Sequence, residues 1–502
     1  MIRIPIILMA ALIMCSFMQE PTKEQPKEQP NPAKEMFDKG TELFNQKKYT
    51  ESIEFFDKVI ALDSTKFQPY YFKGVANYET GKYKEALKYF DLAIAKNPKI
   101  SVIYEAKAKT CIKMGDNLGA DLAYGKAISL EPANANLYYN RGVFYAESKM
   151  KDKALADFNK TLEINVQHKE ANYAKATMLY DKKEFASALE AVKNAIKLDP
   201  KFLNAIALSG AINFNLGNFD AAIVNYTQVL EINPKNEIAF VSRANSYYNI
   251  KQYDKAIADF TTYLKLKPED AKIYLSRANA WIASNKLPEA LEDYNSYIKS
   301  EKSDMNAFVN RASINVSLKK YADAIKDYTT VLEIDKLNTD IYTNRGICYQ
   351  SIGDTAKAIA DYSHALQLNK SDTFALANRA NLYHRMKQYQ KAVDDFDKIL
   401  GLKNNYADAY FERGIAYFYL KNYEKANEDF TSAIKYKFSK IEVYKNRAIT
   451  SEILKNYKAA IADYKKYVEI AQKTTTDKDE ELININKKIK QLEDIQAEEG
   501  KK

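Results

Sequence analysis

Apolar residues recur at three- and four-residue spacing in two runs within each 34-residue stretch of residues 33–474. That spacing is the period of an α-helix with one buried face. The break between the two runs holds Gly, Lys or Asn, as in Gly81-Lys82 and Lys421-Asn422. Glycine and asparagine tolerate the left-handed conformation that ends a helix. The pattern therefore predicts a helix, a short turn and a second helix in every unit.

A small residue marks the first helix of each unit, with a spacing of 34 residues and no insertion or deletion. These residues are Gly40, Gly74, Ala108, Gly142, Ala176, Gly210, Ala244, Ala278, Ala312, Gly346, Ala380, Gly414 and Ala448. Twelve residues later comes alanine, or Ser52 in the first unit, and four residues beyond that comes an aromatic side chain, except at Val192. We expect the small residues to let the two helices approach closely and the aromatic to fill the space between units. A single hairpin leaves half of its apolar surface bare, and stacked neighbours cover it.

Prolines close five of the units, at Pro98, Pro132, Pro200, Pro234 and Pro268. The unbroken 34-residue register and the order of small residue, alanine, aromatic and proline resemble the tetratricopeptide repeat family. The resemblance covers residues 33–474. It implies an all-α, right-handed superhelical solenoid of about thirteen helix-turn-helix repeats that binds other proteins and catalyses no reaction.

In that family, certain first-helix positions face a concave groove that binds partners. The resemblance places the following residues there: Tyr71, Tyr78, Tyr139, Tyr173, Tyr180, Asn245, Tyr248, Asn279, Asn381, His384, Phe411 and Phe418. Aromatic faces and amides suit a peptide or a helix of another protein, although some of these aromatics are expected to pack between helices instead. The Lys and Asn set with which the family clamps an acidic chaperone tail is not found, so that partner is disfavoured.

The residue before the small residue is arginine in eight units, and an aspartate follows each of these arginines after sixteen residues. The pairs are Arg141 with Asp157, Arg243 with Asp259, Arg277 with Asp293, Arg311 with Asp327, Arg345 with Asp361, Arg379 with Asp395, Arg413 with Asp429 and Arg447 with Asp463. The five units without the arginine carry Phe55, Tyr89, Ala123, Ala191 and Asn225 at the second position. Because the two residues come and go together, we predict that each pair joins the two helices of one unit. An arginine held in a bidentate pair is a poor receptor for a foreign anion, so we interpret the pairs as structural. All five exceptions lie among the first six units, and we expect any division of function near residue 237.

Residues 1–18 are predicted to be a signal peptide or a lipoprotein leader. Their apolar run is short for a membrane span, which needs roughly 20 residues. The segment that ends at Cys15 resembles a bacterial lipoprotein box, with Met14 in place of the usual Gly, Ala or Ser, so Cys15 is the candidate for lipidation. Lipidation, simple secretion and an uncleaved anchor all remain open. Residues 19–32 are rich in Pro, Glu and Lys and are expected to form a disordered linker.

Residues 475–502 are predicted to form a capping helix and a tail. Apolar residues form one stripe there, at Leu482, Ile485, Ile489, Leu492 and Ile495. A repeat array needs a terminal element with one polar face, so we favour a cap. The alternative is a short coiled coil that would make the chain a homodimer, but the stripe spans only about two heptads, which is little for that purpose.

The composition adds mainly exclusions. The net charge of +9 is spread over 502 residues with acidic and basic residues interspersed, whereas a nucleic-acid footprint would concentrate it in a stripe. The histidines His168, His364 and His384 are isolated, and neither a zinc-type cysteine pattern nor a glycine-rich phosphate loop occurs. We therefore expect no enzyme, no cofactor and no metal.

These observations favour a protein-binding scaffold that is exported to a Gram-negative cell envelope. It would be periplasmic, a membrane-anchored lipoprotein or secreted, and any membrane association would pass through the N-terminus alone. The alternative is a receptor component that binds glycan or cell wall, because an aromatic and amide groove also suits sugar rings.

Overall fold

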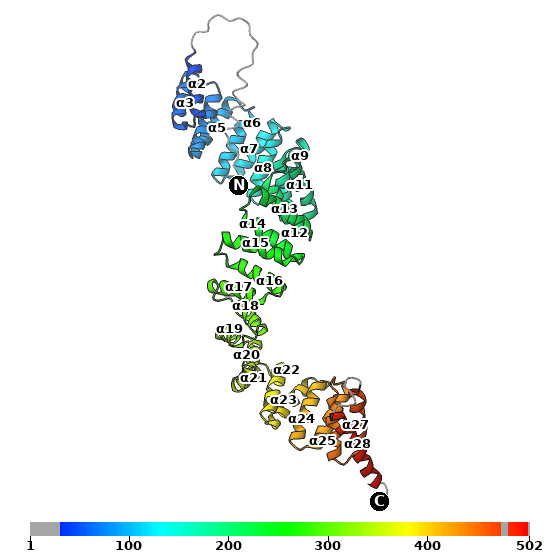
Figure 1. Ribbon diagram of the computed structural model, residues 1–502. Coiled ribbons are helices and arrows are strands. Elements are labelled where there is room, and N and C mark those ends of the chain that lie inside the picture. The colour runs from blue at the N-terminus through cyan, green and yellow to red at the C-terminus, as the bar shows by residue number, and fades with distance from the viewer. Residues whose placement is uncertain (1–30, 473–479, 500–502) are drawn as a thin grey trace. The chain divides into compact units, whose positions relative to one another are not determined.

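The computed structural model describes residues 31–472 and 480–499 (Figure 1). The predictions for residues 1–18, including Cys15, and for nearly all of the linker lie outside these residues. Within them every regular element is an α-helix. The first one begins at Pro32, the last residue of the predicted linker, and the Asn31 side chain caps it by accepting hydrogen bonds from two backbone N–H groups.

Thirteen helical hairpins follow one another in residues 31–472, and each consists of a first and a second helix. The pairs are α2 (Pro32–Asn45) with α3 (Tyr49–Leu62), α4 (Gln68–Glu79) with α5 (Tyr83–Lys96), α6 (Ser101–Lys113) with α7 (Asn117–Leu130), α8 (Ala135–Glu147) with α9 (Lys151–Ile164), α10 (Lys169–Asp181) with α11 (Phe185–Leu198), α12 (Leu203–Asn215) with α13 (Phe219–Ile232), α14 (Glu237–Asn249) with α15 (Tyr253–Leu266), α16 (Ala271–Ala283) with α17 (Leu287–Ser300), α18 (Met305–Ser317) with α19 (Tyr321–Ile334), α20 (Thr339–Ser351) with α21 (Thr355–Leu368), α22 (Thr373–Arg385) with α23 (Tyr389–Leu402), α24 (Ala407–Tyr419) with α25 (Tyr423–Lys435), and α26 (Glu442–Ile453) with α27 (Tyr457–Ala471). A last helix, α28 (Glu480–Glu499), follows the array.

Each hairpin turns at one residue in the left-handed region, where φ lies between 58° and 84°. Glycine occupies this position in four hairpins and Asn285 in one. Lysine occupies it in the other eight, at Lys47, Lys149, Lys183, Lys251, Lys319, Lys387, Lys421 and Lys455. Left-handed backbone costs a non-glycine residue roughly 1–2 kcal/mol. The backbone hydrogen bonds that close the turn hold it there, as when the Lys48 N–H donates to the Leu43 carbonyl at 2.9 Å.

The core of a hairpin forms where the aromatic of its second helix lies over the small residue of its first helix. A Cβ atom added to Gly74 would stand 2.6 Å from the Phe90 ring, and one added to Gly346 would stand 2.7 Å from the Tyr362 ring. This contact corrects the expectation that the aromatic fills the space between units, because the ring is used first inside its own hairpin. It can also reach the next hairpin, as the 5.6 Å stack of Phe56 on Phe72 shows.

The chain divides into two compact units between Tyr263 and Leu264. The first has buried aromatic cores such as the cluster around Phe44, Phe56 and Phe90. The second has its own cores, for example around Tyr362 and Phe396. The boundary falls within α15, later in the chain than residue 237.

Helix α28 packs on the last hairpin. Its stripe residues Leu482, Ile485, Ile489 and Leu492 are buried in a cluster with Tyr464 and Val468 of α27, whereas Ile495 is 40% exposed. The stripe is therefore largely covered within the chain, as a cap requires. The homodimer remains a prediction without a contact to support it.

Candidate functional site

The eight arginines and aspartates that the sequence paired are in contact in the structure. In each pair the arginine Nε–H and Nη2–H groups donate to the two carboxylate oxygens, at 2.5–3.0 Å. All eight aspartates are buried. Burial raises the pKa of Asp429 even though Arg413 lowers it, so desolvation is a real cost of the pair. The arginine joins the two helices of one hairpin and offers little to a foreign ligand.

A third bond from six of these arginines joins neighbouring hairpins, and it was not predicted from the sequence. The Arg345 Nη1–H group donates to Thr329 Oγ1 of the preceding hairpin at 3.0 Å. Equivalent bonds run from Arg243 to Thr227, Arg311 to Asn295, Arg379 to Ser363, Arg413 to Asp397 and Arg447 to Thr431, at 2.5–3.2 Å. The signal was present sixteen residues before each of these arginines, where a hydroxyl, amide or carboxylate stands.

Two lysine-bearing hairpins keep the ion pair to the preceding hairpin but have no aspartate for a pair within the hairpin, where Lys73 instead lies 4.2 Å from the centre of the Tyr89 ring. Lys73 pairs with Asp57, and Lys107 pairs with Asp91 at 2.6 Å, each across to the preceding hairpin. Arg141 has the opposite arrangement, because Gly125 stands where the acceptor would be. The bonds within and between hairpins are therefore separable in this chain.

Replacing Thr329 by the isosteric valine is expected to lower the free energy of unfolding of the second unit by about 1 kcal/mol, because Arg345 loses an acceptor that is partly shielded from water. Urea denaturation would measure the change. Thr330→Val is the control, because Thr330 is half-buried like Thr329 but its hydroxyl bonds to the Lys326 carbonyl of its own helix and to no neighbouring hairpin. An equal loss in both variants would contradict a role for the bond between hairpins.

Three predicted groove aromatics lie in the interior. Tyr71 is 0% exposed, Tyr139 3% and Phe411 7%. Each ring lies beside the core aromatic of its own hairpin, and those of Tyr139 and Phe411 also meet a ring just before the next first helix: His168 lies 4.7 Å from Tyr139, and Phe438 4.2 Å from Phe411. These three residues are core and not groove surface. Tyr173 is half-buried against Phe202 at 5.1 Å.

A second set of candidates lies near the hairpin turns. Tyr78, Tyr180, Tyr248, His384 and Phe418 each pack against the aromatic that begins the second helix of the same hairpin, at 5.4–5.6 Å between ring centres. Tyr248 is still 36% exposed. Asn279 and Asn381 are exposed and Asn245 is half-buried. In the part of the chain that the structure describes, none of these three amides makes a side-chain hydrogen bond.

His168 caps a helix in a way that depends on its protonation. Its Nδ1 accepts a hydrogen bond from the Ala171 N–H at the start of α10, at 3.2 Å. Burial lowers the pKa of His168 below its ordinary value of 6.5, although Glu170 opposes the shift. The unfolded chain therefore takes up this proton at a higher pH than the folded chain does.

Because the folded-state pKa is the lower one, the stability due to the cap is present above pH 6.5 and is lost as the pH falls toward the folded value. The expected loss is about 1 kcal/mol relative to His168→Asn, in which the amide still caps but does not titrate. Asn134 already caps α8 in this way. Urea denaturation of both proteins between pH 7.5 and 5 would test this, and parallel curves would contradict it.

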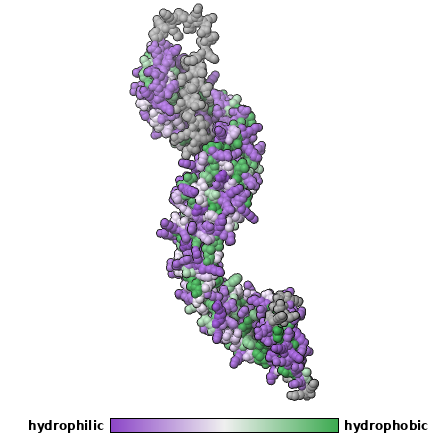
Figure 2. Space-filling view, viewed as in Figure 1, coloured by the Kyte–Doolittle hydropathy of each residue, from purple (hydrophilic) through white to green (hydrophobic). Residues whose placement is uncertain are grey.

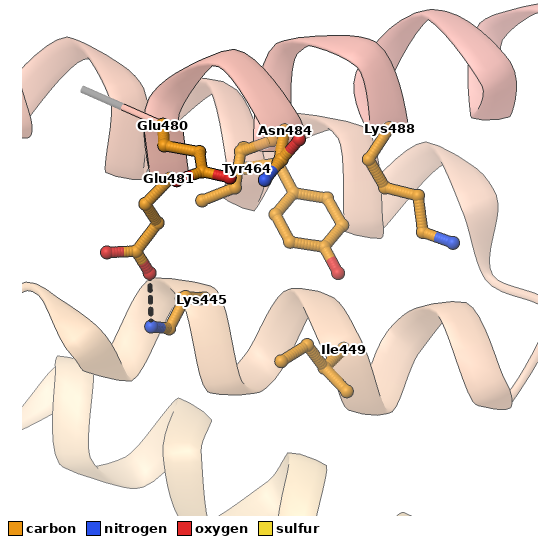
Figure 3. Close-up of a pocket in the computed structure, with 8 residues that line it drawn as sticks. Lys445, Ile449, Tyr464, Glu480, Glu481, Asn484 and Lys488 are labelled. Carbon is orange, nitrogen blue, oxygen red and sulfur yellow. Dashed lines mark hydrogen bonds and ion pairs between the residues drawn. The ribbon is translucent and has the colours of Figure 1, made fainter. Parts of the chain in front are cut away.

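A pocket lies between α28 and the last hairpin and is lined by Lys445, Ile449, Tyr464, Glu481 and Lys488, among others (Figure 3). Figure 3 shows Lys445 of α26 facing Glu481 of α28, and the two are 2.6 Å apart. Lys488 likewise pairs with Glu452 of α26 at 2.7 Å. Because these charges pair with one another, we interpret the pocket as part of the contact between the cap helix α28 and the last hairpin.

Groups suited to covalent or metal chemistry are scarce in the described residues. Cys111 and Cys348 are buried, and burial raises the pKa of Cys348 to about 11. A thiol with that pKa is protonated at neutral pH and is a weak nucleophile. Residues 31–472 and 480–499 contain no cluster of His, Cys, Asp or Glu that could hold a metal ion, and no helix among them is both long and apolar enough to cross a membrane.

Curated relatives share short stretches of this chain. The human protein O-mannosyl-transferase TMTC3 is 32% identical over 24% of this chain and 13% of its own length. Human tetratricopeptide repeat protein 6 is 26% identical over 21% of this chain and 20% of its own. A TPR repeat-containing protein of Methanocaldococcus jannaschii is 28% identical over 32% of this chain and 30% of its own. This chain thus spans less than a third of the length of these relatives.

Solved structures of similar fold include the C-terminal part of a TPR repeat-containing protein from Cytophaga hutchinsonii. It is 21% identical, with a TM-score of 0.43, and the match covers 47% of this chain and 97% of that one. YrrB, described as a TPR protein with an unusual peptide-binding site, is 19% identical with a TM-score of 0.36, over 38% of this chain and 97% of its own.

Family models described as tetratricopeptide repeat match most of the helical array. The matched segments are residues 33–66, 67–100, 123–156, 210–271, 241–306, 306–336, 339–372, 375–406, 407–437 and 441–474. Together they span well over half of the chain, and each overlaps the hairpins described above. The chain belongs to the tetratricopeptide repeat family, an all-α fold of stacked helical hairpins that serves as a scaffold for protein–protein interaction.

Proposed function

We propose that this chain is a scaffold in the bacterial cell envelope that holds peptide or helical segments of other proteins on the exposed face of its first helices. The observation that carries this proposal is which polar side chains are already paired within the array and which are exposed without a partner among the described residues. The charged row at the arginines is used inside the array, while amides such as Asn279 and Asn381 are exposed on the first helices and carry no partner among the described residues. Figure 2 shows apolar residues interspersed among polar ones on the face in view.

We also propose that the chain has no catalytic activity of its own. The described thiols are buried, and the charges around the pocket at α28 are paired with each other. A protein of this kind acts by position: it holds partners close together, and exposed aromatic and amide groups supply contact area and hydrogen bonds.

Photo-crosslinking would test the binding surface. A photoreactive residue at Asn381 is expected to capture a defined protein from the envelope fraction, whereas one at Lys326, whose side chain is 77% exposed on the second helix α19, is expected to capture little. Equal capture at the two sites would contradict a partner on the first-helix face.

The envelope location is supported by the leader-like residues 1–18 and the lipobox-like context of Cys15. Mass spectrometry of the mature N-terminus would test it. A diacylglycerol-modified Cys15 would identify a membrane-anchored lipoprotein, and a terminus beyond residue 15 would identify a secreted form. An intact, unmodified Met1 in the soluble cell interior would contradict export.

The alternative function is recognition of glycan or cell wall, and one observation favours it. Tyr389 and Tyr419 stack at 4.8 Å with ring planes 7° apart, and Tyr419 is 54% exposed. A flat aromatic surface of this kind can carry a sugar ring. Retention of the purified chain on peptidoglycan, without a stoichiometric protein partner in crosslinking, would favour this reading.

A further inference from the structure

One surface of the second unit combines exposed apolar side chains with unpaired carboxylates, and it lies on the first helices α20, α22, α24 and α26. In each 34-residue repeat, counted from residue 33, the ninth and thirteenth residues follow the second by seven and eleven positions. At 3.6 residues per helical turn, these three residues therefore lie on one side of the first helix. We call the side that they form in these four hairpins the α20–α26 face.

Large apolar side chains are exposed on this face. Phe374 is 77% exposed, Tyr419 54%, Ile453 43% and Ile347 38%. Ile415 lies between them and is half-buried. Single exposed apolar residues are ordinary, but a row that continues over four successive hairpins is typical of an interaction surface.

Two polar groups on or beside this face lack partners among the described residues. The Asn381 amide, at the ninth position, makes no side-chain hydrogen bond there. His384 is at the twelfth position, beside the face, and its Nε2 is buried from solvent without a hydrogen-bond partner. The His384 ring lies 5.7 Å from the ring of Tyr419. Burial lowers the pKa of His384 below its ordinary value of 6.5.

The edge of the face at the helix N-termini is acidic. Asp340, Asp408 and Glu442 occupy the second position of the repeats that contain α20, α24 and α26. They are exposed and form no ion pair in the part of the chain that the structure describes. An acid in the first turn also interacts favourably with the helix dipole. The helix dipole alone does not explain the acidic row, because the same position is mostly not acidic in the seven hairpins of the first compact unit. Those hairpins hold Lys34, Gln68, Val102, Asn136, Glu170, Asn204 and Ile238 there.

We propose that the α20–α26 face binds an amphipathic segment of another protein that carries apolar or aromatic side chains along one side and lysine or arginine along the neighbouring edge. The apolar side chains would cover Phe374, Ile415 and Tyr419, and the basic edge would face the three carboxylates. This inference rests on the proposed scaffold function and names the chemistry and the location of one partner. Charge complementarity at the edge would set the direction in which the segment lies.

Two synthetic peptides test the proposal. They share one pattern of Leu and Phe and differ only in carrying Lys or Glu at the remaining edge positions, and their binding to the full chain is followed by fluorescence anisotropy. The Lys peptide is expected to bind about 10-fold or more tightly than its Glu twin at low salt. Asp340→Asn, Asp408→Asn and Glu442→Gln together are expected to remove that preference without affecting folding, because all three side chains are exposed.

The apolar part has a matched control. Phe374→Ala with Tyr419→Ala is expected to weaken binding of the Lys peptide about 10-fold or more, because these side chains present the largest contact area. Ile238→Ala changes an exposed apolar residue at the same second position, on α14 of the first unit. That variant is expected to leave the affinity within about twofold, as for residues outside the contact.

Four outcomes would overturn the inference: binding of neither peptide, equal binding of both, an equal loss in the control variant, or binding of soluble peptidoglycan fragments that the Phe374→Ala, Tyr419→Ala variant abolishes. None of the first three decides the scaffold function itself. That function fails separately, when photo-crosslinking on the first helices of both units captures no envelope protein.

Discussion

Replacing Arg311 by alanine is expected to lower the free energy of unfolding of the second unit by about 3–5 kcal/mol, because the change leaves a buried carboxylate without its counter-charge. Asp327 is 3% exposed and receives both of its guanidinium bonds from Arg311, at 3.0 and 2.5 Å. The same substitution removes the bond of 2.8 Å from Arg311 to Asn295 of the preceding hairpin. Urea denaturation would measure the loss.

A second substitution measures the coupling between Arg311 and Asp327. Adding Asp327→Ala to Arg311→Ala removes the stranded charge, so the double variant is expected to cost clearly less than the sum of the two single variants. Additivity to within about 0.5 kcal/mol would contradict a coupled buried pair. The exposed pair Lys326–Asp323, with side chains 77% and 53% exposed, is the control, and its removal is expected to cost about 0–1 kcal/mol.

Replacing Leu482 and Ile489 together by aspartate is expected to release α28 from the last hairpin. These side chains are 3% and 7% exposed, and burying an unpaired carboxylate costs more than the contact with α27 supplies. The ion pairs that α28 makes with Lys445 and Glu452 cannot hold it alone, since partly exposed pairs contribute about 0–1 kcal/mol each. Without its cap the terminal hairpin exposes apolar surface around Tyr464 and Val468.

Hydrogen exchange would follow the release. Amides of α27 and α28 are expected to exchange much faster in the double variant, while those of α20 to α23 change little, because each hairpin contacts mainly its neighbours. Ile483→Asp is the control, since Ile483 is on the same helix but 41% exposed. Protection of α27 that survives the double variant would mean that α28 is not a structural cap.

The repeat pattern was enough to predict the helical hairpins and several of the contacts within them. The small residue, the alanine twelve residues later and the aromatic after it recur because each is a contact inside a hairpin: Phe90 lies over Gly74, where a Cβ would come within 2.6 Å. Such local contacts leave a periodic trace in the chain. The pairing of Arg311 with Asp327 was visible for the same reason, since both ends lie in one unit.

The candidate site was harder to predict because its residues depend on what covers them. Tyr139, Tyr173 and Phe411 occupy the same register position, and each meets a ring just before the next first helix, yet Tyr139 and Phe411 are buried while Tyr173 is half-buried. The register position alone therefore does not determine whether such a ring is exposed. The bonds from arginine to the preceding hairpin were missed because their acceptors vary among Thr, Asn, Ser and Asp.

By itself, the sequence determined the number and phase of the hairpins, the helix-ending turns, the buried ion pairs within hairpins and the apolar stripe of the last helix, because each follows from short-range periodicity. Only the tertiary structure decided which aromatics are core and which are surface, that the arginines also join successive hairpins, that the last stripe is covered by α27, and that Phe374 and Tyr419 remain open beside unpaired carboxylates. These properties depend on the packing of one hairpin against the next, where the size and shape of neighbouring side chains set exposure.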